Sequence, residues 1–296
     1  MVQTVDNALI QEFKDSVIQI SQQGDARVRP HVTEEASSAE YKNWDRLDPI
    51  DALERDKAVR RQDTQFVDDN WTRRTSTPRV FEATMTFEDF DKAQMAIDPE
   101  SAFTESIGMS MRRAYDDVCI AAASADATTN TDNGTLGTVA FPAGNIIGDG
   151  TANITFDDVT AIQESFMLDE IMPDMPKVAV VTPHQVRKLL QLTEQTNADY
   201  VQTQALQQLN ASGIVPNWMG FTWIVSNRLT VPGAGEHYCI FMTKQALGLQ
   251  VNMNMKVRVG ENPDKSYQWQ VFYQFAAGCV RVQDEHIRLG HFADAV

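Results

Sequence analysis

One helix of unusual length is the feature that most constrains this chain. Asp98, Pro99 and Glu100 supply an N-cap, a proline at the first helical position and an acidic first turn. Apolar residues then recur at helical spacing up to about Ser124. At 1.5 Å per residue, a helix over residues 98–124 spans roughly 40 Å, which is long for a domain of this size. Its apolar face comprises Phe103, Ile107, Met111, Ala114, Val118 and Ala122.

Strand patterns flank this helix on both sides. Residues 80–88 alternate apolar and polar side chains, which predicts a half-buried strand directly before it. Near the C-terminus, residues 256–259 and 267–273 flank the turn at residues 261–264 and predict a long hairpin. Short strands at residues 278–282 and 286–289 complete the chain. The expected fold class is therefore α+β.

A compact α/β block is expected between the helix and the hairpin. Thr155 and Asp158 are placed like a capping box at the start of a helix. The apolar run 177–181 predicts a buried strand, and Thr182-Pro183 starts a second helix. Further strands are predicted at residues 221–225 and 238–242, after a polar, glutamine-rich stretch around residues 193–212.

Residues 126–153 have the composition of a surface hairpin. They are rich in Thr, Asn, Gly and Asp, with turn signals at Asn133-Gly134 and Asp149-Gly150. The apolar pieces 139–141 and 146–147 are expected to be its strands. The aspartates could attract calcium, but they lack the spacing of an EF-hand, so no metal site is predicted.

The first twenty residues carry an amphipathic pattern. Val5, Leu9, Phe13, Val17 and Ile20 recur at helical spacing, and Gly24 follows as a C-cap. Such a helix packs either on its own domain or on a neighbouring subunit, and both interpretations stay open.

The stretch from residue 25 to residue 78 is dense in charges of both signs and poor in large apolar residues. A segment of this composition cannot build a core of its own. It also contains Trp44 and Trp71, and aromatic anchors inside a charged rim are typical of surfaces that meet a partner. A solvated charged loop is the alternative interpretation.

Composition excludes several classes of protein. Twenty-five basic and forty-one acidic residues leave a net charge of −16, which opposes tight binding to nucleic acid phosphates. The three cysteines, Cys119, Cys239 and Cys279, contain no CxxC pair and are expected to be buried thiols of a reducing compartment. The sequence shows no signal peptide and no apolar run long enough for a membrane span, so we expect synthesis in a cytoplasm.

No catalytic signature is visible. Phosphate-binding, nucleotide-binding, GxSxG and HExxH motifs are all missing, and no cofactor is predicted. His237 and Cys239 would face one side of a strand, but two ligands do not make a structural zinc site. Adjacent carboxylates such as Asp116-Asp117 point in different directions on a helix. A soluble acidic enzyme stays an alternative only because distant residues can assemble into a triad.

The order of these elements resembles the tailed-phage major capsid proteins of the HK-ninety-seven fold. In that family an N-terminal arm, a long loop (the E-loop), a strand, a spine helix, an α/β domain and a long hairpin follow one another. Short phrases agree with it: residues 180–183, 223–229 and 278–281 look like strands of its A-domain and later region. The resemblance covers nearly the whole chain.

The resemblance implies a division of the chain. It assigns residues 1–44 to the N-terminal arm, 45–78 to the E-loop, and 79–126 with 250–277 to the P-domain, whose spine helix is residues 98–124. Residues 127–154 form an inserted surface hairpin, and residues 155–249 with 278–296 form the A-domain. The residues expected to contact a neighbouring subunit are Trp44, Arg60, Arg61, Phe66, Trp71, Arg73 and Arg74.

The resemblance also implies the partners and the function. The chain would assemble with itself into pentamers and hexamers of an icosahedral shell, in a bacterial cytoplasm, around double-stranded DNA that it does not bind sequence-specifically. Because the charged loop begins so early, we expect a separate scaffolding protein, together with a portal and, as an open possibility, a decoration protein. Some relatives join the E-loop to the P-domain by a lysine–asparagine bond. Lys57 has no matching acceptor here, so that chemistry is not carried over. An encapsulin, a bacterial shell around an enzyme cargo, is the alternative within the fold.

Overall fold

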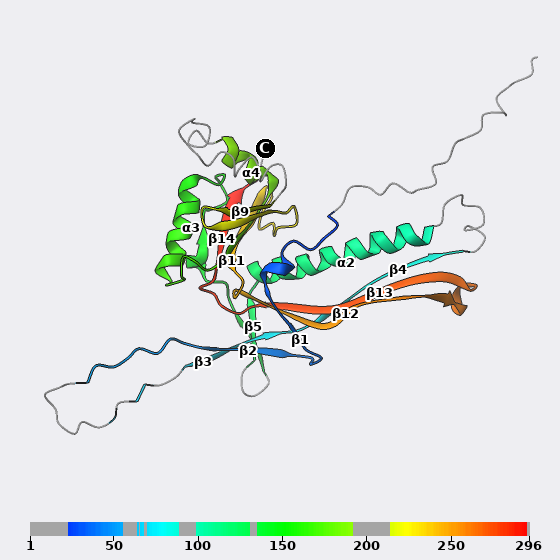
Figure 1. The fold of residues 1–296 in the computed structure, drawn as a ribbon, viewed down its shortest axis with the longest axis horizontal. Helices are drawn as coiled ribbons and strands as arrows, with labels where there is room; N and C mark the ends of the chain where they lie inside the picture. Colours follow the sequence, from blue (N-terminus) through cyan, green and yellow to red (C-terminus); the bar gives the residue numbers. More distant parts are fainter. Residues whose placement is uncertain are drawn as a thin grey trace, which may run out of the picture. The chain divides into compact units, whose positions relative to one another are not determined.

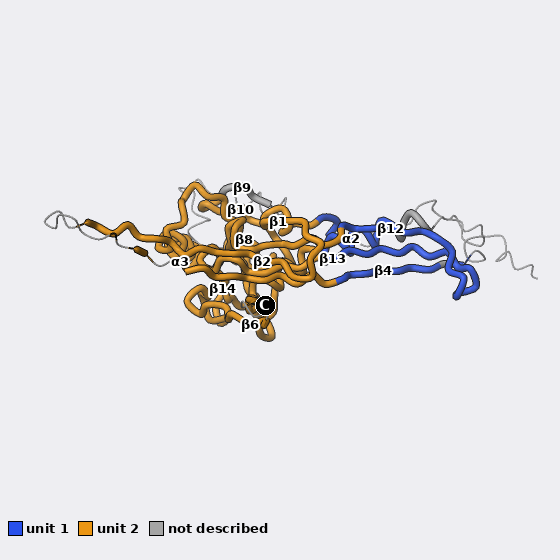
Figure 2. The backbone as a smooth tube through the Cα atoms, turned by 90° about the horizontal axis from the view of Figure 1, so that it is seen from below, with its two compact units in different colours: residues 1–25, 80–114, 254–276 blue, residues 26–79, 115–253, 277–296 orange. Residues whose placement is uncertain are grey.

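The computed structural model describes residues 23–55, 64, 66, 67, 70–88, 99–130, 135–191 and 214–294 (Figure 1). The chain divides into two compact units (Figure 2). The described part of unit 1 comprises residues 23–25, 80–88, 99–114 and 254–276, and unit 2 holds the rest. The predicted helix over residues 5–20 lies outside the described residues.

Unit 2 is built on a six-stranded sheet of order β7-β14-β11-β8-β10-β9. Its centre is β8 (Lys177–Val181), which pairs in parallel with β10 (Phe221–Val225) and antiparallel with β11 (Glu236–Thr243). All five β8 residues are buried, as their continuous apolar run predicts. The remaining strands are β7 (Ile146–Ile147), β14 (Ile287–Ala293) and β9 (Ile214–Trp218).

Two helices accompany this sheet. α3 (Phe156–Leu168) begins with the predicted capping box, because Thr155 and Asp158 each bind the other's backbone N–H. It packs on the sheet through Phe166, whose ring centroid lies 6.1 Å from that of Phe221. α4 (Pro183–Gln191) follows β8 with a proline at its first position, as expected.

A second sheet has the order β1-β12-β13-β4. β12 (Leu247–Asn262) and β13 (Gln268–Arg281) are the long hairpin that the sequence predicts, joined by a short turn, η4 (Pro263–Lys265). β1 (Thr33–Ala36) pairs in parallel with the first part of β12, and β4 (Arg79–Phe87) is the predicted strand before the long helix. The rings of Phe81 on β4 and Phe275 on β13 stack at 4.9 Å.

The long helix α2 (Pro99–Ser124) confirms the strongest sequence prediction. Ile107 and Met111 are buried as expected, and Tyr273 of β13 donates to the carbonyl of Thr104. Beyond Met111 the buried face differs from the prediction. Tyr115, Cys119, Ile120 and Ala123 are buried, whereas the predicted Ala114, Val118 and Ala122 are only half-buried.

Two smaller hairpins complete unit 2. β2 (Lys42–Leu47) and β3 (Trp71–Ser76) pair antiparallel, as do β5 (Ala127–Asn130) and β6 (Leu136–Val139). The second hairpin corrects one prediction, because Ile146-Ile147 pairs with β14 instead of with residues 139–141. β9 was not predicted, and residues 278–281 are the end of β13 instead of a separate strand. Two 3-10 turns, η2 (Arg29–His31) and η3 (Ala143–Asn145), lie between these elements.

A carboxylate on α2 fixes the described segment that leads into β1. Asp116 is 1% exposed, and it accepts hydrogen bonds from the backbone N–H groups of Arg27 (2.7 Å), Val28 (3.0 Å) and Arg29 (3.2 Å). Arg27 also donates to the carbonyl of Val225 at 2.7 Å. One buried side chain therefore satisfies three donors that have no partner in a regular helix or sheet.

We expect Asp116→Asn to lower the free energy of unfolding by about 2 kcal/mol, because bonds to a charged acceptor are weakened and one donor faces an amide NH₂. Thermal and urea unfolding of the isolated subunit measure this loss. Asp117→Asn is the matched control, because Asp117 is only half-buried and pairs with Arg228. An equal loss in both variants would contradict a special role for Asp116.

Candidate inter-subunit surface

The β2–β3 hairpin, in the stretch where the sequence predicts a partner-binding loop, has a firmly anchored base. Asp284 is the centre of the anchor, with its side chain 15% exposed. It contacts Arg74 at 2.8 Å and Arg281 at 2.5 Å, and Arg46 lies at 4.0 Å. Arg46 also contacts Glu285 at 3.1 Å. These ion pairs tie both strands of the hairpin to the segment between β13 and β14.

Trp44 is a second anchor of the same base. Its indole is 9% exposed and lies in a small cluster with Ala127 and Val280. The indole N–H donates to the Ser76 hydroxyl at 3.1 Å. Position 248 must be glycine, because a Cβ there would lie 2.7 Å from the Trp44 ring. The tryptophan is thus a core residue of the subunit.

The arms beyond this base carry large apolar side chains that are exposed to solvent. Phe66 is 87% exposed and Trp71 is 62% exposed. Leu47 lies directly opposite Trp71 in the hairpin and is also exposed. A cluster of exposed large apolar side chains marks an interaction site in a soluble protein. We call the following residues the hairpin apolar set: Leu47, Ile50, Leu53, Phe66, Val67 and Trp71.

The structure divides the predicted contact residues into three groups. Phe66 and Trp71 are exposed, and Arg73 is partly exposed while it contacts Asp45 at 2.6 Å. Trp44 and Arg74 are buried within the subunit. Arg60 and Arg61 lie outside the described residues.

One expectation about these charges is wrong. The composition indicated that the charged stretch cannot build a core, and the resemblance to capsid proteins implied that its charges find partners only on neighbouring subunits. In its described part, Asp45, Arg46, Arg73 and Arg74 all have ion-pair partners within the subunit. The acidic partners Asp284 and Glu285 lie more than 200 residues away in the sequence, where no local pattern reveals them. Leu47, Ile50 and Leu53 were also missed as contact candidates, although large apolar residues at every third position of a charged segment were a usable signal.

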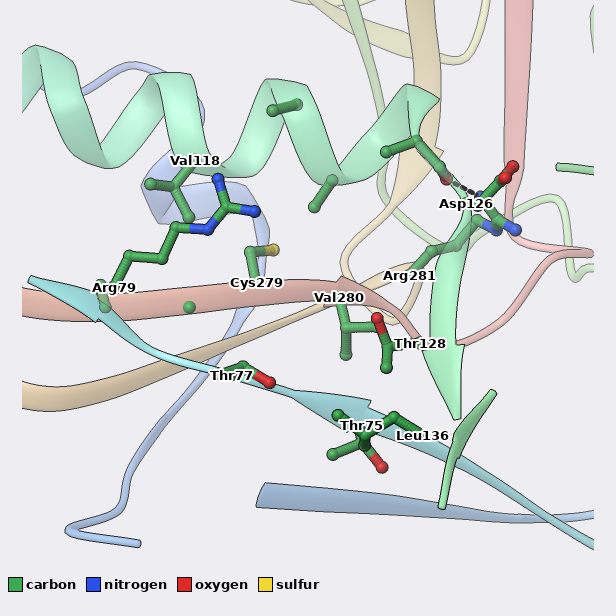
Figure 3. A pocket seen from close by; sticks show the side chains of 15 residues that line it. Thr75, Thr77, Arg79, Val118, Asp126, Thr128, Leu136, Cys279, Val280 and Arg281 are labelled. Atoms are coloured by element: carbon green, nitrogen blue, oxygen red, sulfur yellow. Dashed lines mark hydrogen bonds between the residues drawn. The ribbon is translucent and has the colours of Figure 1, made fainter. Parts of the chain in front are cut away.

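A cavity of about 330 Å³ lies beside the hairpin base in unit 2 (Figure 3). Val118 of α2, Thr75 of β3 and Cys279 of β13 face it, and Arg281 crosses its end to donate to the Ala125 carbonyl. A contact with Cys279, together with burial, raises the pKa of the Cys119 thiol well above its usual range. Burial raises the pKa of Cys239 to about 12. Neither thiol is therefore a nucleophile at neutral pH.

Metal-ligand groupings and membrane-spanning helices are two further features that the described residues do not show. No three His, Cys, Asp or Glu side chains come together among them in a way that could hold an ion. No helix in the described part of the chain is long and apolar enough to cross a membrane.

The chain is similar in structure to several solved capsid and phage proteins. The capsid of cyanophage P-SCSP1u is 15% identical, with a TM-score of 0.73 over 100% of this chain and 96% of that one. Mycobacterium phage Che8 is 14% identical, with a TM-score of 0.70 over 97% and 98% of the two chains. The capsid of the native GTA particle is 12% identical, with a TM-score of 0.68 over 97% and 96%. At such identities these likenesses show the HK-ninety-seven fold.

The family follows from the sequence itself. No curated protein matches the chain. The model of the family described as "Phage capsid protein" matches residues 5–289, which is nearly the whole length. The chain therefore belongs to the phage capsid protein family, and it is a structural subunit of a phage shell.

Proposed function

We propose that this subunit assembles into pentamers and hexamers of an icosahedral head that encloses the double-stranded DNA of a tailed phage. The hairpin apolar set is the observation that carries the proposal. The base of the β2–β3 hairpin is fixed by Asp284 and Trp44, and the exposed Phe66 and Trp71 lie beyond that base. Because the base is already fixed within the subunit, burying the exposed Trp71 beside it costs little additional ordering of the base.

The parts of the chain take the roles that the resemblance implies. Unit 1, with most of α2, β4 and the far part of the β12–β13 hairpin, corresponds to the P-domain. The six-stranded sheet with α3 and α4 corresponds to the A-domain, and β2–β3 is the base of the E-loop. The β5–β6 hairpin is the first part of the insertion at residues 127–154, and β7 of the same stretch belongs to the six-stranded sheet.

The remaining partners follow from charge and from the needs of a shell. A net charge of −16 favours weak, sequence-independent contact with packaged DNA. Assembly in the host cytoplasm would use a separate scaffolding protein and a portal, and the outer face would be open to a decoration protein.

The variant Phe66→Ser/Trp71→Ser tests the role of the hairpin apolar set. Both side chains are exposed, so the free energy of unfolding of the isolated subunit is expected to change by no more than about 0.5–1 kcal/mol. Its melting temperature should therefore shift only slightly. Loss of two aromatic anchors at an interface is expected to lower the yield of shells at least tenfold, since each such anchor contributes about 2 kcal/mol or more. Sedimentation velocity and negative-stain microscopy, with and without the co-expressed scaffold gene, measure the yield.

Leu136→Ser/Val231→Ser is the matched control, because these two side chains are 46% and 56% exposed and lie outside the β2–β3 hairpin. Equal shell yields from the wild type and the Phe66/Trp71 variant would contradict the role of the hairpin. A wild-type chain that stays monomeric or dimeric under every condition would contradict the shell function itself.

A further inference from the structure

Two of the three cysteines meet between α2 and the end of β13. Cys119 of α2 is 0% exposed, and its thiol contacts the side chain of Cys279 on β13. Both are free thiols, and both belong to unit 2. Two thiols in contact can be joined as a disulfide with little movement of the backbone.

The contacts around this pair hold α2 and β13 together. Arg281 lies two residues after Cys279, and it donates to the carbonyl of Ala125 directly after α2. Side chains two residues apart on a strand point to the same face, so Cys279 also points toward α2, as Figure 3 shows. Val118 and Ala122 of α2 line the cavity beside it. An ordered part of the subunit therefore brings the two thiols together.

Cys279 is the member of the pair that a small oxidant can reach. It lines the cavity of about 330 Å³ at the hairpin base, and it is partly exposed, whereas its neighbours Gly278 and Val280 are buried. A peroxide fits such a cavity, since a water molecule occupies only about 30 Å³ of the liquid. Cys119 lies behind Cys279 with no exposed surface, and the third cysteine, Cys239, is fully buried in β11.

We propose that Cys119 and Cys279 form an oxidation site, at which a peroxide closes a disulfide that braces α2 against β13. The Cys279 sulfur attacks one peroxide oxygen, the O–O bond breaks, and a sulfenic acid and one water form. The Cys119 sulfur then bonds to the Cys279 sulfur and displaces the hydroxyl. That hydroxyl leaves with the Cys119 proton as a second water. The two thiols lose two electrons and two protons, and the peroxide is reduced to two waters.

The properties of Cys119 set the order of these two steps. Its raised pKa leaves the first attack to Cys279. Because the two side chains touch, the Cys119 proton can pass directly to the departing hydroxyl, so the second step needs no free Cys119 thiolate.

The brace goes beyond the proposed shell function. Both thiols belong to one subunit, so the reaction needs no neighbouring copy. A cytoplasm keeps such thiols reduced, whereas a particle released from the cell meets oxidants without that protection. The disulfide closes a loop of about 160 residues and so restricts the unfolded chain. Oxidation is therefore expected to stabilise the folded subunit.

Treatment of the wild-type subunit with hydrogen peroxide tests the site. Remaining thiols are blocked in denaturant, and the non-reduced digest is analysed by mass spectrometry. We expect the Cys119 and Cys279 peptides to be joined with the loss of two hydrogens, and Cys239 to be recovered as a blocked thiol. A reductant should restore all three thiols. Unlinked Cys119 and Cys279 peptides, or a linkage that includes Cys239, would overturn the inference.

Thermal melting measures the brace itself. The oxidised wild-type subunit is expected to melt about 5 °C or more above the reduced subunit. Cys119→Ala lacks the partner thiol and should show no such rise after peroxide treatment, whereas the matched Cys239→Ala keeps the pair and should show it in full. Linked chains that melt no higher than reduced chains would overturn the brace. Neither experiment depends on whether shells assemble, so its failure is distinct from a failure of the shell function.

Discussion

An Asp284→Ala subunit is expected to lose about 3–5 kcal/mol of its free energy of unfolding. Among the ion pairs of the described residues, Asp284 is the carboxylate that lies within 4.0 Å of all three arginines, Arg46, Arg74 and Arg281. The side chains of Arg281 and Arg74 are 0% and 9% exposed, so removal of the carboxylate leaves buried guanidinium groups without their counter-ion. Since a domain is stable by only about 5–15 kcal/mol, the loss consumes a large share of that margin.

Urea unfolding followed by circular dichroism measures this loss. Glu285→Ala is the matched control, because the neighbouring Glu285 side chain is 49% exposed and contacts only Arg46 among these arginines. An exposed pair of this kind contributes at most about 1 kcal/mol. In the Asp284 variant the backbone hydrogen bonds at the base of the β2–β3 hairpin should also open to solvent more often. Faster amide hydrogen exchange in β2 and β3 would show this. Equal unfolding midpoints for the two variants would exclude the anchor role of Asp284.

Much of the fold could be predicted because its elements have strong local periodicity. Pro99 and the apolar repeat fixed the start and length of α2, and the alternation at residues 80–88 identified β4. Thr155 and Asp158 form the predicted capping box, and the continuous apolar run of β8 is buried at all five positions. Each of these signals lies within a few residues, where propensity and side-chain spacing act directly.

Elements that depend on distant residues were missed. β2 and β3 are strands because they pair with each other across more than twenty intervening residues, and neither has a regular apolar alternation. Trp44 is buried because Gly248 leaves room for its ring, and the polar sequence around it gave no sign of this. The buried face of α2 shifts to Tyr115, Cys119 and Ala123, because tertiary packing overrides an apolar spacing that alanines leave ambiguous.

The candidate site likewise contains residues that local sequence could identify and residues whose roles depend on distant partners. Phe66 and Trp71 could be selected from composition, because large aromatic residues in a charged segment have no core to enter. Arg73 and Arg74 could not be separated from each other by sequence, although one contacts the nearby Asp45 and the other the distant Asp284. A long-range ion pair depends on the folded backbone and leaves no trace in local spacing.

Met111→Asp is expected to prevent the subunit from folding stably at all. The Met111 side chain is 3% exposed in the middle of α2, one turn after the buried Ile107. Its replacement removes a buried apolar side chain, at a cost of about 2–5 kcal/mol, and places a carboxylate at a position that is shielded from water. Ser110→Asp is the matched control, because it adds the same charge one residue earlier at an exposed position of the same helix. Circular dichroism and thermal melting should show a near-wild-type Ser110 variant and an unfolded or aggregated Met111 variant. A Met111→Asp subunit that melts like the control would mean that this face of α2 is not part of the core.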